Sequence, residues 1–106
     1  SYATDVSRRV IKKAQMARTA RFAGVICSGH AAGQIKETCG KSFLAVTPGI
    51  RPVWDISTGD DQARVMTPAR AIQNGSDHLV IGRPIRDAKD PSVAARQVLT
   101  EIEKAI

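Results

Sequence analysis

Apolar residues recur along the chain at two different spacings, and the change of spacing separates predicted helices from predicted strands. Residues 5–21 carry apolar side chains at the interval of an amphipathic helix, with Thr4 or Asp5 in place to cap it. A short apolar run rich in β-branched residues follows at 23–28 and predicts a buried strand. A second helix is predicted over 30–39, before a glycine suited to a helix C-terminus.

The second half of the chain continues this alternation. Residues 43–47 and 78–82 are apolar runs that predict two further strands. Between them, residues 49–66 form a long polar segment. Polar loops of this length are uncommon in a compact domain and often carry function.

Two later helices are predicted from their start signals. Thr67 and Asp90 are capping residues, and each precedes a proline suited to the first helical position, Pro68 and Pro91. The first of these helices is predicted to end at the Asn-Gly pair that follows it, and the second to end at about Lys104.

Helices that alternate with short, wholly apolar strands predict an α/β fold with a parallel sheet covered on both faces. Three strands would leave the edges of such a sheet open. The chain of 106 residues is also short for a βα barrel, which typically needs about 250. Part of the fold is therefore expected to lie outside residues 1–106.

Composition and charge restrict the class of partner. A net charge of +6, from 16 Lys and Arg against 10 Asp and Glu, favours anionic partners. Aromatic residues make up only 4%, which argues against nucleic acid, and no apolar run approaches the ~20 residues that span a bilayer. The first residues lack a signal-peptide pattern, so a cytoplasmic location is expected. The densest basic group is interpreted as a solvated helix face: Arg8, Arg9, Lys12 and Lys13.

The cysteines and histidines predict neither a metal site nor catalysis. Cys27 and Cys39 lack the spacing of zinc ligands, and Cys27 lies within an apolar run, as a buried small hydrophobic residue would. No disulfide framework is indicated. His30 and His78 have no carboxylate or cysteine partner nearby in the sequence, so surface or helix-start positions are expected for both.

Candidate ligand-binding residues follow the predicted strands, where parallel βα folds bind their ligands. Arg51 comes directly after a Pro-Gly turn, and the alternative role for it is to hold its own loop. Gly82 and Arg83 form the strongest local signal. Glycine lets a ligand approach the backbone, and the guanidinium fork of arginine matches phosphate oxygens.

Two further candidates have weaker support. Gln62 offers an amide that can donate to a phosphate oxygen, whereas its neighbours Asp60 and Asp61 would repel a phosphate and are expected to order the loop. Ser28 ends the first strand, where its hydroxyl suits either ligand contact or capping of the next helix.

Taken together, four ordered stretches resemble the orotidine 5′-monophosphate decarboxylase family: residues 24–28, 46–52, 60–68, and 75–85 followed by Asp90-Pro91. Single pieces such as Gly-Arg-Pro are weak, but the ordered set is specific and extends over nearly the whole chain. The resemblance implies a TIM (βα)₈ barrel of the ribulose-phosphate-binding type. Residues 1–106 would supply its C-terminal portion, strands six to eight, with strands one to five lying outside the chain.

The resemblance also assigns roles to the candidate residues. Arg51, Gln62, Gly82 and Arg83 match the positions that hold the nucleotide 5′-phosphate, and Ser28 matches the serine that contacts the pyrimidine. The implied enzyme is a carboxy-lyase of de novo pyrimidine biosynthesis that converts orotidine 5′-monophosphate to UMP and CO₂. No metal or organic cofactor is implied.

The catalytic groups implied by the resemblance are not found in this chain. The family uses an Asp-x-Lys-x-x-Asp segment with a further lysine and aspartate, and the nearest imitation, around Asp87 and Lys89, lacks the second spacing. No catalytic residue is therefore expected in residues 1–106, which alone should be inactive. An N-terminal segment of the same protein and a homodimeric assembly are the implied partners.

Two other interpretations remain open at this point. One is a non-catalytic module that binds nucleotides or sugar phosphates through the same loops. The other is a different phosphate-binding barrel enzyme, such as a sugar-phosphate decarboxylase or an indole-pathway enzyme. The Asp60-Asp61-Gln62 loop argues against the second of these.

Overall fold

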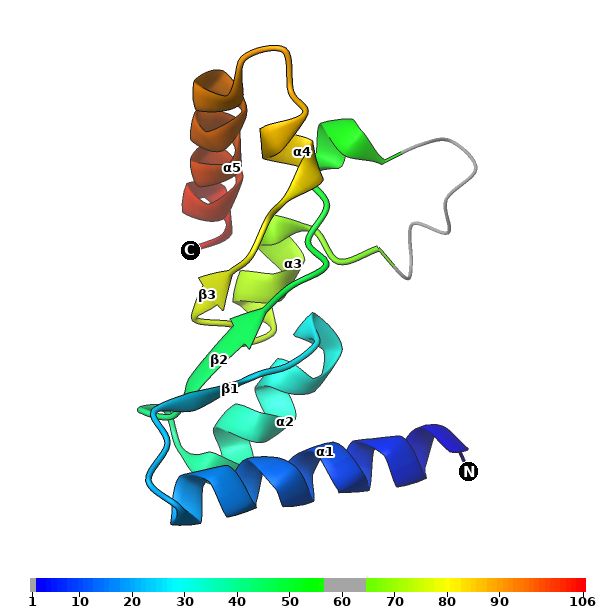
Figure 1. Ribbon diagram of the computed structural model, residues 1–106, viewed down its shortest axis with the longest axis vertical. Helices are drawn as coiled ribbons and strands as arrows, with labels where there is room; N and C mark the ends of the chain where they lie inside the picture. The colour runs from blue at the N-terminus through cyan, green and yellow to red at the C-terminus, as the bar shows by residue number, and fades with distance from the viewer. Residues whose placement is uncertain (1, 57–64) are drawn as a thin grey trace.

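The computed structural model describes residues 2–56 and 65–106 (Figure 1). Three parallel strands form one sheet in the order β1-β2-β3: β1 (Gly24–Ile26), β2 (Leu44–Thr47) and β3 (His78–Leu79). The helices are α1 (Tyr2–Thr19), α2 (Gly29–Cys39), the 3₁₀ turn η1 (Val53–Asp55), α3 (Pro68–Gln73), α4 (Arg83–Arg86) and α5 (Pro91–Ala105). The predicted α/β class is confirmed in this region.

The predicted helix starts are confirmed at three of the four long helices. The Ser28 hydroxyl accepts from Ala31 N at 3.2 Å, and the hydroxyl of Thr67 accepts from Arg70 N at the same distance. Asp90 accepts from the backbone of the first turn of α5. The prediction for α1 is wrong in its start, because the helix already begins at Tyr2 and therefore contains Thr4 and Asp5.

β3 is shorter than the predicted strand 78–82. Val80 N still donates to Thr47 O at 2.9 Å, but β2 ends there. Pro48 has no N–H to donate, and Gly49, at φ +71°, turns the backbone away from the sheet. Residues beyond Val80 therefore lose their partner in the neighbouring strand.

The sheet is covered by the described residues on one face only, contrary to the prediction. Alternate strand residues pack against the helices, and these include Cys27, 8% exposed, and Ala45, fully buried. On the opposite face Ile26 and Val80 are 76% and 52% exposed. The helices of residues 2–56 and 65–106 thus leave an apolar face of the sheet open.

Two apolar clusters build the covered side. The larger joins α1, α2 and β2 around Ala14, Cys27, Ala32, Ile35, Cys39, Phe43 and Ala45. The smaller joins Ile50, Met66 and Ala71, against which Leu79 and Ile81 pack. Both cysteines are free and buried, as expected for Cys27, and burial raises the pKa of the Cys27 thiol.

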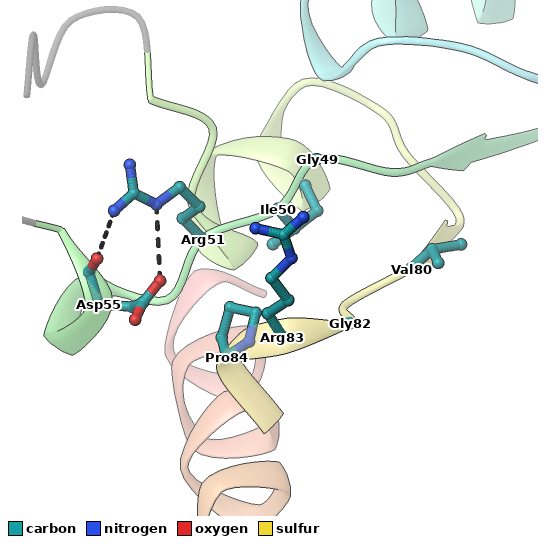
Figure 2. Close-up of a pocket in the computed structure, with 8 residues that line it drawn as sticks. All are labelled: Gly49, Ile50, Arg51, Asp55, Val80, Gly82, Arg83 and Pro84. Atoms are coloured by element: carbon teal, nitrogen blue, oxygen red, sulfur yellow. Dashed lines mark hydrogen bonds and ion pairs between the residues drawn. The ribbon is translucent and has the colours of Figure 1, made fainter. Parts of the chain in front are cut away.

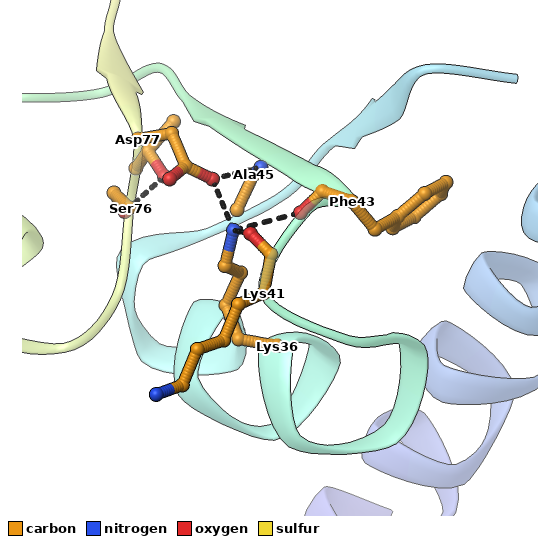
Figure 3. Close-up of polar contacts among 7 residues, drawn as sticks. Lys36, Lys41, Phe43, Ala45, Ser76 and Asp77 are labelled. Atoms are coloured by element: carbon orange, nitrogen blue, oxygen red, sulfur yellow. Dashed lines mark hydrogen bonds and ion pairs between the residues drawn. The ribbon is translucent and has the colours of Figure 1, made fainter.

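A polar cluster fastens α2 to the N-terminal ends of β2 and β3 (Figure 3). Lys36 Nζ lies 2.6 Å from Asp77 Oδ2 and donates to the carbonyls of Lys41 and Phe43 at 2.6 and 2.8 Å. The same Asp77 oxygen accepts from Ala45 N at 2.8 Å. Partial burial raises the pKa of Asp77, but the hydrogen bonds from Lys36 and Ala45 and the Lys36 charge outweigh it, so the pKa lies below its usual value.

Candidate functional site

A hollow of about 490 Å³ lies at the C-terminal ends of β2 and β3 (Figure 2). Its lining comes from two separate segments, 49–55 after β2 and 80–84 after β3, and consists of Gly49, Ile50, Arg51, Asp55, Val80, Gly82, Arg83 and Pro84. The volume falls within the range usual for small-molecule sites. The structure therefore brings Arg51, Gly82 and Arg83 together around one hollow.

The segment after β2 is held by a bridge between residues far apart in sequence. Ile50, 3% exposed, pairs in a parallel β-bridge with Met66, and Arg51 N donates to Met66 O at 2.9 Å. The Arg70 side chain donates to Val65 O at 2.6 Å and so helps to hold the segment that contains Met66. The backbone at Arg51 is thereby fixed above the end of the sheet.

The Arg51 guanidinium is oriented by η1. One terminal nitrogen donates to Asp55 O at 2.6 Å, and Nε lies 3.5 Å from the Asp55 carboxylate (Figure 2). Both side chains are more than a third exposed, so this ion pair adds little to stability. Its main effect is to restrict where the guanidinium points.

The segment after β3 presents Gly82 and Arg83. A Cβ at Gly82 would meet no atom within 4 Å, so the space above its backbone is open. Gly82 O accepts from Ile85 N and Arg86 N at 3.1 and 2.9 Å, which closes α4. The side chain of Arg83 is exposed and, within residues 2–56 and 65–106, makes no hydrogen bond or ion pair.

Two guanidinium groups and one carboxylate thus surround the hollow. The arginines exceed the carboxylate in charge, and each has a planar array of donors that pairs with two oxygens at once. This arrangement suits a small anion with several oxygens, such as a phosphate monoester.

The other predicted residues are not part of the described hollow. Gln62 lies outside the described residues, as do Asp60 and Asp61. Ser28 is at the same edge of the sheet, at the end of β1, but is not among the residues that line the hollow. Its capping bond to Ala31 uses the hydroxyl oxygen as an acceptor and leaves the O–H as a donor.

Sequence reasoning missed Asp55 and Glu101 as residues near this site. Asp55 follows Arg51 by four residues, a spacing that brings side chains together in a helical turn, but η1 itself was not predicted. Glu101 Oε1 accepts from Val53 N at 3.0 Å, across 48 residues of sequence. No local sequence pattern can predict a contact between residues so far apart in the sequence.

Among the described residues, no three His, Cys, Asp and Glu side chains gather as a metal site. None of the described helices has both the length and the apolar character needed to cross a membrane.

Comparison with known proteins gives a consistent result. The family model "Orotidine 5′-phosphate decarboxylase / HUMPS family" matches residues 2–98. The chain is 48% identical over 105 residues to an orotidine 5′-phosphate decarboxylase of Desulfosudis oleivorans, covering 99% of this chain and 42% of that protein. It is 50% identical over 99 residues to a protein of the same name from Geobacter sulfurreducens, covering 93% and 41%.

A solved structure has a similar fold. The crystal structure of orotidine 5′-phosphate decarboxylase from Lactobacillus acidophilus superposes with a TM-score of 0.76 at 36% identity, covering 92% of this chain and 38% of that one. The chain therefore spans about two fifths of the length of the proteins it matches.

Proposed function

The chain belongs to the orotidine 5′-phosphate decarboxylase / HUMPS family, and we propose that it supplies the phosphate-binding part of a carboxy-lyase. The complete protein would convert orotidine 5′-monophosphate to UMP and CO₂ in pyrimidine biosynthesis. The observation that supports this most directly is the convergence of Arg51 and Arg83, from two strand ends, on one hollow.

The proposed architecture is a (βα)₈ barrel in which β1, β2 and β3 are strands six, seven and eight. Two observations support it. The chain matches 42% of the Desulfosudis oleivorans relative, and the exposed side chains of Ile26 and Val80 give the sheet an apolar face with no cover among the described residues. In a βα barrel such a face is filled by side chains of the other strands. Those strands, and the homodimer that the resemblance implies, are part of the proposal.

Each candidate residue has a proposed role in holding the nucleotide. Arg51 and Arg83 pair with phosphate oxygens, and Gly82 lets the phosphate approach the backbone. Gln62 donates its amide to the same group. Ser28 donates its O–H to a carbonyl of the pyrimidine, which its capping bond to Ala31 permits.

In this proposal residues 1–106 bind the phosphate, and groups elsewhere in the protein catalyse the loss of CO₂. Loss of CO₂ leaves a carbanion-like centre on the pyrimidine, and the lysine–aspartate groups that the resemblance assigns to this step lie outside residues 1–106. No metal or organic cofactor enters the proposal. Binding energy from the phosphate, remote from the reacting carbon, is available to close the site and lower the barrier.

A chimaera tests the proposal. Residues 1–106 replace the matching segment of the Desulfosudis oleivorans relative, and decarboxylation of orotidine 5′-monophosphate is followed by loss of absorbance. We expect a folded, active chimaera, because the segment would supply every phosphate contact. A chimaera that folds but neither binds UMP nor decarboxylates would overturn the proposal.

The alternative is a non-catalytic nucleotide-binding module, and one observation favours it. The hollow holds two arginines, yet residues 1–106 contain no Asp-x-Lys-x-x-Asp segment. Calorimetry of the isolated 106-residue chain with UMP separates the two. Tight binding without any completing segment would favour the module, whereas we expect binding only in the chimaera.

A further inference from the structure

The contact between α5 and η1 joins two segments that no sequence pattern connects. Glu101 lies on α5, and its Oε1 accepts from Val53 N at 3.0 Å. Val53 opens η1, and the residue before it, Pro52, has neither an N–H nor a side chain able to cap the turn. Glu101 therefore performs from another helix the capping function that a local serine or aspartate usually has.

What Glu101 caps is the turn that orients Arg51. η1 closes through Asp55 N donating to Pro52 O at 2.9 Å, and Pro52 itself is fully buried. Asp55 then holds the Arg51 guanidinium through its carbonyl and its carboxylate. A chain of contacts thus runs from α5 through Val53 and Asp55 to the guanidinium.

Helix stability does not account for a glutamate at this position. Glu101 lies near the C-terminal end of α5, where a negative charge interacts unfavourably with the helix dipole. Its second oxygen, Oε2, is buried and has no hydrogen-bond partner among the described residues. A buried, unpaired oxygen costs stability, so the bond to Val53 is what the carboxylate contributes here.

We propose that Glu101 is a positioning residue for phosphate binding, acting on Arg51 through η1. This inference rests on the proposed function. Without the Glu101 cap, η1 loosens, Asp55 no longer restricts the guanidinium, and ordering Arg51 on the ligand costs more entropy.

The test compares two ways of removing the bond in the chimaera. Glu101→Ala removes the acceptor. Val53→Pro removes the donor, and Pro52 at φ −58° and ψ 155° already has the conformation that a following proline requires. Both should raise KM for orotidine 5′-monophosphate and the inhibition constant of inorganic phosphate together, by roughly threefold to tenfold. The value of kcat should change less.

Three matched variants serve as controls. Glu101→Gln keeps an acceptor oxygen and should restore KM and phosphate inhibition to within about twofold of the parent. Val53→Ala keeps the N–H and should do the same. Glu103→Ala removes an exposed glutamate from the same helix and should have no effect on either constant.

The outcomes separate this inference from the proposed function through a parallel Arg51→Ala variant. If Arg51→Ala weakens phosphate binding but Glu101→Ala and Val53→Pro do not, the positioning role alone is wrong. If Arg51→Ala leaves KM and phosphate inhibition unchanged, the proposed role of Arg51 fails and that of Glu101 fails with it. Lower kcat and melting temperature with unchanged KM and phosphate inhibition would assign Glu101 a structural role only.

Discussion

Arg51 and Arg83 line the same hollow but are held very differently. Arg51 is bound at its backbone by Met66 and at its guanidinium by Asp55. The Arg83 side chain is exposed and makes no hydrogen bond or ion pair within the described part of the chain. Arg51 therefore enters binding with its direction largely set, whereas Arg83 must lose side-chain freedom when it meets an anion.

At the residue scale, we predict that Arg83→Ala in the chimaera raises KM for orotidine 5′-monophosphate by roughly tenfold to a hundredfold. This corresponds to the loss of a charged hydrogen bond of about 1.5–3 kcal/mol. The KM of Arg83→Lys should lie between those of the parent and Arg83→Ala, because the charge remains but the planar fork is lost. Arg86→Ala is the control, since Arg86 pairs with Asp87 and does not line the hollow. Equal KM values for Arg83→Ala and Arg86→Ala would show that Arg83 does not bind the phosphate.

At the scale of elements, the Lys36–Asp77 pair connects a helix to the beginnings of two strands. Lys36 is 14% exposed and uses its ammonium group on one carboxylate and two carbonyls. All three acceptors belong to the segments that lead into β2 and β3 (Figure 3). The register of these strands at their N-terminal ends therefore depends on one side chain from α2.

We predict that Lys36→Met destabilises the chimaera by about 1–3 kcal/mol, because it leaves a part-buried carboxylate and two carbonyls without their donor. The measurement is the urea midpoint at neutral pH. Lys41→Met is the matched control. The Lys41 side chain points away from the cluster and only its backbone carbonyl takes part, so that variant should unfold at the parent midpoint. Equal midpoints for the two variants would contradict the prediction.

The elements also show what could be predicted from sequence. The starts of α3 and α5 are confirmed because a capping residue and a proline act within one turn. η1 and α4 were missed because three or four residues give no periodic pattern. The length of β3 depends on where β2 ends, and that neighbour is more than thirty residues away in sequence.

The same limit applies to the candidate site. That Arg51, Gly82 and Arg83 lie close together was predictable, because each follows an apolar strand and parallel strands bring their ends to one edge. Asp55 and Glu101 were not, because their partners are set by a short turn and by helix packing. The ligand-binding roles of all the candidate residues, Ser28, Arg51, Gln62, Gly82 and Arg83, stay predictions.

At the scale of the whole molecule, the open face of the sheet is the main departure from expectation. Ile26, the last residue of β1, and Val80, the first residue after β3, are exposed, whereas the other face of the sheet is well packed. Single exposed apolar residues are common on protein surfaces, but an apolar sheet face with open edges favours association.

We therefore predict that the isolated 106-residue chain self-associates as its concentration rises, as measured by sedimentation velocity. Ile26→Ser should weaken this association, because it removes the most exposed side chain of the open face. Met16→Ser is the control, since Met16 is 62% exposed but lies on α1, away from the sheet. A chain that stays monomeric at all concentrations would show that this face is not adhesive.

The Lys36–Asp77 pair and the two arginines lie at opposite ends of the same short strands. A substitution that strengthens the ion-paired end has no direct contact with a ligand at the other. The stability of this chain and its affinity for a ligand can therefore be changed almost independently, by substitutions at opposite ends of the same strands.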